Sequence, residues 1–181
     1  MKTVARPTIT LAILLLPFLA GSAQAQTRAA AAADVASPET IVLALYETVN
    51  REPGRNFDWV RMRTLFLPTA TMIPAVEQTG GVFRILTVED FINWIDQNTV
   101  VGGANDRGFQ EEQIAQHVEQ YGDIAQVFST YQKHFWRDTN ILGRGINSIQ
   151  LVNNEGRWWI VSVIWDEEVG AGALPARYLT K

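Results

Sequence analysis

The apolar positions in the first half of the chain recur every three or four residues, which is the spacing of one face of an α-helix. Ser37, Pro38 and Glu39 favour a helix start, because they supply an N-cap, a proline at the first helical position and an acid in the first turn. Similar starts occur at Asn56 and Thr87. The sequence therefore predicts three helices, over residues 37–50, over residues 56–67 and from residue 87 to the loop at residues 102–106.

The pattern changes after the loop at residues 102–106. Long segments rich in β-branched and aromatic residues follow, and the short turns between them are typical of an antiparallel meander. Two shorter strands, at residues 71–76 and 82–86, precede the loop. Helices early and strands late predict an α+β fold, with the three helices packed on one face of a strongly curved antiparallel sheet. The long segments are residues 109–119, 124–137, 141–152 and 157–167.

The N-terminus has the three parts of a secretory signal peptide. Lys2 and Arg6 precede an apolar run at residues 9–19, and small residues follow up to Ala25. The run is shorter than the ~20 residues that span a bilayer, so we expect cleavage after Ala25 and no membrane anchor. The protein is therefore predicted to be exported, to the periplasm or the medium.

Four segments follow from these patterns. Residues 1–25 are the predicted signal peptide, and residues 26–36, which contain five consecutive alanines, are a predicted flexible tether. Residues 37–168 form the predicted folded domain. Residues 169–181, with two glycines and a proline, are predicted to be a loose tail.

Composition narrows the function. The 181 residues carry a net charge of −4 and no cysteine, which argues against a nucleic-acid-binding surface and excludes disulfides. His117 and His134 are the two histidines, and neither belongs to a recognisable metal motif. The chain has no phosphate-binding loop, dinucleotide fingerprint or nucleophile elbow, so we expect no metal and no cofactor.

Several short segments carry a family resemblance. They are Phe57-Asp58-Trp59 with residues 65–68, the run Tyr121 to Tyr131, the run Arg144 to Val152, and residues 156–160. With the order of elements, they make residues 37–168 resemble an exported bacterial branch of the NTF2-like (nuclear transport factor 2), SnoaL-like superfamily. The resemblance implies a cystatin-like cone that encloses a pocket between helices and sheet. The superfamily includes isomerases, dehydratases, hydrolases and proteins that only bind, so the pocket residues must decide the function.

Polar residues on the predicted strands could enter such a pocket. Ser129 and Tyr131 share one strand face, and Asn147 lies on the next strand. Strand alternation also turns His117 inward, together with Phe109 and Gln113. Aromatic side chains would form the apolar wall, so we expect a binder of a small, largely apolar organic molecule. The predicted wall is Trp59, Phe91, Trp94 and Trp158.

A cofactor-free lyase, isomerase or hydrolase is the alternative. His117 or Asp166 would move a proton, and Tyr131 would donate a hydrogen bond to a developing oxyanion. Alternation places Asp166 on the strand face of Trp158 and Ile160. This mechanism requires that one of the two bases reaches the cavity. Otherwise His117 is a hydrogen-bonded strand histidine and Asp166 is a solvated strand end.

The sheet face turned away from the helices could pair two subunits. The resemblance implies a homodimer through the sheet, with the same face used by both subunits. The expected residues of this face are Val127, Ile149, Val161 and Val163, or their neighbours on the opposite face.

Overall fold

The computed structural model describes residues 29–180. The predicted signal peptide and the first residues of the predicted tether lie outside this range. The helices are α1 (Pro38–Val49), α2 (Trp59–Leu65), α3 (Val88–Asn98) and α4 (Glu168–Ala171), with 3-10 turns η1 (Ala32–Val35), η2 (Val76–Thr79) and η3 (Ala176–Tyr178). The strands are β1 (Phe66–Ile73), β2 (Leu86–Thr87), β3 (Gln110–Tyr121), β4 (Ile124–His134), β5 (Gly143–Asn154) and β6 (Arg157–Glu167).

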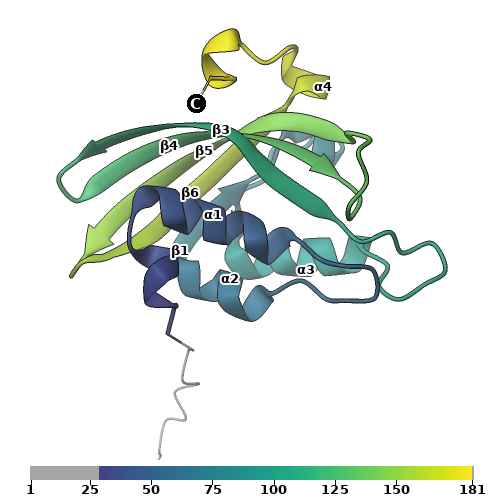
Figure 1. Ribbon diagram of the computed structural model, residues 1–181, viewed down its shortest axis with the longest axis horizontal. Helices are drawn as coiled ribbons and strands as arrows, with labels where there is room; N and C mark the ends of the chain where they lie inside the picture. Colours follow the sequence, from purple (N-terminus) through teal and green to yellow (C-terminus); the bar gives the residue numbers. More distant parts are fainter. Residues whose placement is uncertain (1–28, 181) are drawn as a thin grey trace, which may run out of the picture.

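The six strands form one sheet in the order β2-β1-β6-β5-β4-β3. Strands β3 to β6 are an antiparallel meander, and β1 lies parallel to β6. The sheet curves over helices α1, α2 and α3, which cover its inner face (Figure 1). The predicted α+β architecture with three helices on one face is confirmed.

The helix starts follow from local hydrogen bonds. Ser37 and Thr40 form a reciprocal capping box at α1, and Thr87 and Asp90 form another at α3. Helix α2 begins later than predicted, because Asp58, not Asn56, accepts the Arg61 N–H at 3.0 Å. It also ends at residue 65, where β1 begins, so β1 starts five residues before its predicted position.

Two β-bulges shift which side chains face the helices. In β3, Gln113 pairs with Tyr131 and Ala115 with Thr130, so Ile114 is the extra residue. In β6, Val161 is the extra residue in the ladder with β5. Because each bulge inserts one residue, the alternation reverses beyond it.

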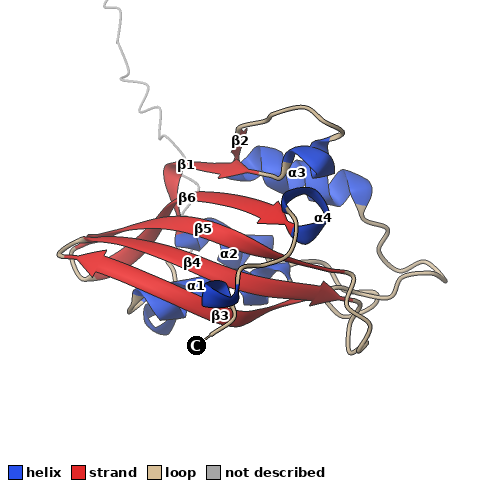
Figure 2. Ribbon diagram, turned by 90° about the horizontal axis from the view of Figure 1, so that it is seen from above, coloured by secondary structure: helices blue, strands red, loops and turns tan. Residues whose placement is uncertain are grey.

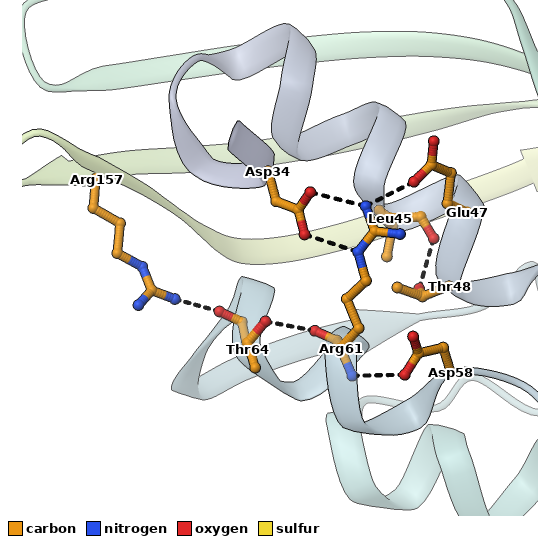
Figure 3. A network of polar contacts seen from close by, with 8 residues as sticks. All are labelled: Asp34, Leu45, Glu47, Thr48, Asp58, Arg61, Thr64 and Arg157. Atoms are coloured by element: carbon orange, nitrogen blue, oxygen red, sulfur yellow. Dashed lines mark hydrogen bonds and ion pairs between the residues drawn. The ribbon is translucent and has the colours of Figure 1, made fainter. Parts of the chain in front are cut away.

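The predicted tether is partly folded. Residues 32–35 form η1, and Val35 is buried against the core. Arg61 on α2 donates two hydrogen bonds of 2.8 Å to Asp34 and a third contact reaches Glu47 on α1 (Figure 3). The prediction of a flexible tether is therefore wrong for residues 32–35. They are held by the ion pair between Asp34 and Arg61, a residue on a different helix.

The predicted loose tail is also ordered over its described residues, 169–180. After α4 the chain crosses the outer face of the sheet, opposite the helices (Figure 2). The Tyr178 ring lies 5.5 Å from Phe128 and 5.9 Å from His117. Thr130 donates to the Tyr178 carbonyl, so the tail covers part of β3 and β4. The glycines of this segment predicted that it would make no stable contacts. Aromatic packing and a hydrogen bond to the outer face of the sheet nevertheless hold it in place.

The outer face mixes polar residues with exposed apolar ones such as Ile124 and Ile164, and three of the four expected valine and isoleucine residues lie on the other face. Val127, Ile149 and Val163 are buried on the inner face. Their outward neighbours include Gln126, Ser148, Gln150 and Ser162, and Gln126 donates to Ser148 at 2.8 Å. No helix among the described residues combines the length and apolarity needed to cross a membrane.

Candidate functional site

A cavity of about 790 Å³ lies between the three long helices and the inner face of the sheet. Aromatic rings form much of its wall. Phe91 is central, with ring centres at 6.4 Å from Trp59, 6.2 Å from Trp94 and 5.8 Å from Trp165, all edge to face. Val100, in the loop that follows α3, lines the cavity and is also exposed to solvent. The cavity is therefore open at this loop. The wall is thus apolar and held by mutual ring packing.

A buried ion pair lies at the β4 and β6 side of the cavity. Glu167 is 8% exposed, and its Oε1 accepts from the Tyr131 hydroxyl at 3.1 Å, from Lys133 Nζ and from the Gln78 amide. The other end of the Gln78 amide accepts from the Trp165 indole at 2.8 Å. Burial, followed by the nearby carboxylates, raises the pKa of Tyr131, so its hydroxyl stays protonated.

A second polar group joins α1 to the sheet. The Tyr46 hydroxyl lies 2.7 Å from Ser129 Oγ and accepts from the Asn147 amide at 3.0 Å. Gln113 also donates to Ser129, at 2.7 Å. Burial raises the pKa of Tyr46. These hydrogen bonds satisfy the polar atoms that helix packing removes from water.

Glu111 on β3 lines the same cavity. Protein surrounds it, although part of its surface is open to the cavity, and burial raises the pKa of its carboxyl to about 7. Lys133 and Asn147 lower the pKa and Glu167 raises it, but burial has the larger effect. A carboxyl group with this pKa can exist in either protonation state near neutral pH.

The open end is held by one carboxylate. Asp106 pairs with Arg51 at 2.8 Å and accepts main-chain N–H groups from Gly54, Gly102 and Gly108 at 2.8–3.0 Å. These three N–H donors lower the pKa of Asp106. Arg51 in turn lies over the Phe57 ring. The loops around the opening are thereby tied to one another.

Five of the predicted ligand-binding residues line the cavity: Tyr131, Asn147, Trp59, Phe91 and Trp94. Ser129 is fully buried behind them and bonded to Tyr46. Trp158 is a buried core residue that does not reach the cavity.

The two predicted bases do not reach the cavity. His117 is exposed on the outer face and bonded to the Arg177 carbonyl. Asp166 is exposed on the same face and accepts the N–H of Glu167 at 2.8 Å. Both predictions are wrong for the same reason: each residue follows a β-bulge, so simple alternation assigns it to the opposite face.

Sequence reasoning missed Glu111 and Glu167 as cavity residues. Glu111 precedes the bulge and shares the alternation of Phe109 and Gln113, so the sequence contained a signal for it. Glu167 is inward only because Val161 is the extra residue in β6. Within residues 29–180, no cluster of three or more acidic or histidine side chains is placed to hold a metal ion.

No family model and no curated protein matches the sequence. Among solved structures, the chain is similar to a cystatin-like protein of unknown function from Nostoc punctiforme, at 13% identity, with a TM-score of 0.55 and coverage of 71% of this chain and 86% of that one. A protein of unknown function from Mycobacterium tuberculosis matches at 14% identity and a TM-score of 0.53, over 76% of this chain and 75% of that one. An NTF2-like protein of unknown function from Shewanella baltica is 14% identical over 70% of this chain and 87% of that one, with a TM-score of 0.48.

Proposed function

We propose that this chain, which has an NTF2-like, cystatin-like fold, binds a small and largely apolar organic molecule in the cavity under its curved sheet. The observation that carries the proposal is an aromatic wall that meets a few convergent polar groups. Cavities of this size and composition are typical of small-molecule sites, in which the apolar wall supplies affinity and the polar groups set orientation. Here Tyr131 and Asn147 are among the polar groups at the wall, together with Glu111, Lys133 and Glu167.

Native mass spectrometry of the purified full chain tests the proposal. A small molecule that stays bound during purification adds a reproducible mass, and that mass is lost when the protein unfolds. N-phenyl-1-naphthylamine, a neutral apolar dye, provides a second readout, because Trp59, Trp94 and Trp165 in the wall can transfer excitation energy to it. The absence of both an adduct and dye binding would overturn the proposal.

The Tyr131 hydroxyl donates to Glu167, so toward a ligand it can act only as an acceptor, here for the N–H of the dye. A Tyr131→Phe variant is expected to bind the dye about three- to tenfold more weakly, the usual range for one lost hydrogen bond. The fold should survive, because Glu167 keeps Lys133 and Gln78 as partners. Tyr121→Phe is the matched control: it removes the same hydroxyl from a residue that is 86% exposed. Dye titrations of both variants measure the effect, and equal affinities would remove Tyr131 from the site.

Cofactor-free proton transfer is the second candidate, and Glu111 is the observation that favours it. The bases expected from sequence face outward, but Glu111 is a carboxyl group in the cavity with a pKa of about 7, close to the value that suits a general base. Tyr131 already donates to Glu167, so it is not a free oxyanion donor. The candidate therefore depends on Glu111.

Proton transfer can be measured with 2-tetralone, a bicyclic ketone with acidic protons next to its carbonyl. If Glu111 acts as a base, the protein will speed the exchange of these protons in D₂O, as followed by proton NMR. Glu111→Gln should abolish the acceleration, and Glu112→Gln on the outer side of the same strand should not. If the 2-tetralone protons exchange no faster with the protein than in buffer alone, proton transfer is rejected and binding stands as the proposed function.

Export and dimerisation are further parts of this proposal. Export is supported by the N-terminal pattern at residues 1–25. A homodimer through the sheet is supported by the exposed Ile124 and Ile164 on the outer face. The ordered tail over β3 and β4 limits the part of that face open to a partner.

A further inference from the structure

The charged side chains that line the cavity are almost all paired. Arg51 pairs with Asp106, Lys133 with Glu167, and Arg107 with Asp138 outside the cavity. Among the cavity-lining residues that the structure describes, Glu111 is the charged side chain without an ion-pair partner. When Glu111 is ionised, this part of the cavity therefore carries one negative charge that the protein does not balance.

Lys133 is not available as an ion-pair partner for Glu111, because it already pairs with Glu167. It faces Glu111 across β3 and β4, but its ammonium contacts Glu167. Glu167 is buried, so releasing Lys133 would leave a buried carboxylate without its cation, which is costly. When Glu111 is ionised, its charge is therefore open to a cation from outside the protein.

The nearby wall suits a cation. Trp59, Phe91 and Trp94 present aromatic rings to the same cavity, and aromatic faces attract organic cations when water is excluded. A carboxylate next to aromatic rings combines charge neutralisation with an apolar surface. Simple anions find no free cation in this lining, since each arginine and lysine already has a carboxylate.

From this arrangement we infer that the cavity selects amphiphilic amines: the apolar body lies against the aromatic wall, and the protonated amine binds the Glu111 carboxylate. The inference rests on the proposed function and names the class of ligand. It makes Glu111 the specificity-determining residue of the site.

Binding will depend on the protonation of Glu111. The titratable groups that face it are Tyr46 from α1, Tyr131 and Lys133 from β4, and Glu167 from β6. The pKa values of both tyrosines are raised, so neither hydroxyl ionises near neutral pH. His117 and His134 do not line the cavity. Amine binding should strengthen as pH rises through about 7, where Glu111 releases its proton.

Three naphthalene probes of similar size test the inference: 1-naphthylmethylamine, 1-naphthalenemethanol and 1-naphthoate. Isothermal titration of the full chain near pH 8 should show the amine binding about tenfold or more tightly than the alcohol, with the carboxylate weakest. The preference for the amine should largely disappear in Glu111→Gln and, in the unmodified protein, near pH 5.5. Glu112→Gln, which removes the same charge from the opposite strand face, should keep it.

The outcomes distinguish the preference for amines from the more general claim that the cavity binds small apolar molecules. If the alcohol or the carboxylate binds as tightly as the amine, or if the preference survives in Glu111→Gln, the inference is overturned while cavity binding stands. If the dye binds but none of the three probes does, the inference is likewise overturned. If no probe and no dye binds and no adduct is found by native mass spectrometry, the proposed function itself fails.

Discussion

Replacing Glu111 by glutamine will stabilise the protein by about 3 kcal/mol near pH 8 and leave its stability near pH 4 almost unchanged. The pKa of Glu111 is about 7 in the folded protein and 4.5 without the fold. Between these values the folded protein holds a proton that the unfolded chain has released, so the free energy of unfolding falls as pH rises. Glutamine does not titrate, so the variant avoids this loss.

Urea unfolding at several pH values measures the effect. The difference between Glu111→Gln and the unmodified protein should open above pH 4.5 and become constant above about 7. For a domain of this size it corresponds to a rise of roughly 6–12 °C in Tm. Glu112→Gln, whose side chain is 44% exposed, should change stability by less than about 0.5 kcal/mol. A Glu111→Gln variant with unchanged stability near pH 8 would contradict the burial of an ionisable group at this position.

This prediction separates stability from function. A carboxylate that weakens the free protein at neutral pH is compensated when a bound cation balances its charge. The same substitution should therefore raise Tm and abolish the amine preference. Opposite effects on folding and binding are typical of groups placed for a ligand.

Replacing Gly145 by alanine is expected to cost about 1–3 kcal/mol and to disrupt the cavity. A Cβ at Gly145 would lie 2.6 Å from the Tyr131 hydroxyl and would also clash with the Asp166 main-chain carbonyl on β6. The carbonyl belongs to the sheet and cannot move freely, so Tyr131 must shift. The hydrogen bond from Tyr131 to Glu167 should then be lost, and dye binding should weaken with it.

Gly143, two residues earlier on the same strand, provides the control. A Cβ there would meet Lys133 Cε at 2.7 Å, but this methylene can rotate aside while Nζ keeps its contact with Glu167, whereas the main-chain carbonyl at Gly145 cannot. Gly143→Ala should therefore cost less than about 1 kcal/mol. Denaturant unfolding and dye titration of both variants test the pair. Equal stabilities, or unchanged dye affinity in Gly145→Ala, would show that Tyr131 is not held against Gly145.

Local patterns in the sequence predicted most of the elements. The capping residues Ser37 and Thr87 located α1 and α3, because a cap acts within four residues of itself. Apolar alternation located the four long strands to within a few residues. The aromatic wall was also predicted in part: Trp59, Phe91 and Trp94 are inward, while Trp158 lies in the core.

The errors share a physical cause. His117 and Asp166 were assigned to the wrong face because the bulges at Ile114 and Val161 arise from pairing with neighbouring strands. The tail was predicted to be loose because its own sequence shows no partner for Tyr178. That partner is Phe128 on β4, about 50 residues earlier in the chain. Neither the partner strand nor the packing surface is present in the local pattern.

The sequence by itself determined helices α1 and α3 and the four long strands, since the 3.6- and 2-residue periods and the caps are local properties. It also determined the α+β class and three of the aromatic residues of the wall, Trp59, Phe91 and Trp94. The tertiary structure decided which carboxyl groups enter the cavity, which cations they pair with, and that Glu111 remains unpaired there. These depend on register and on neighbours from distant strands, so the chemistry of the cavity is set by the fold.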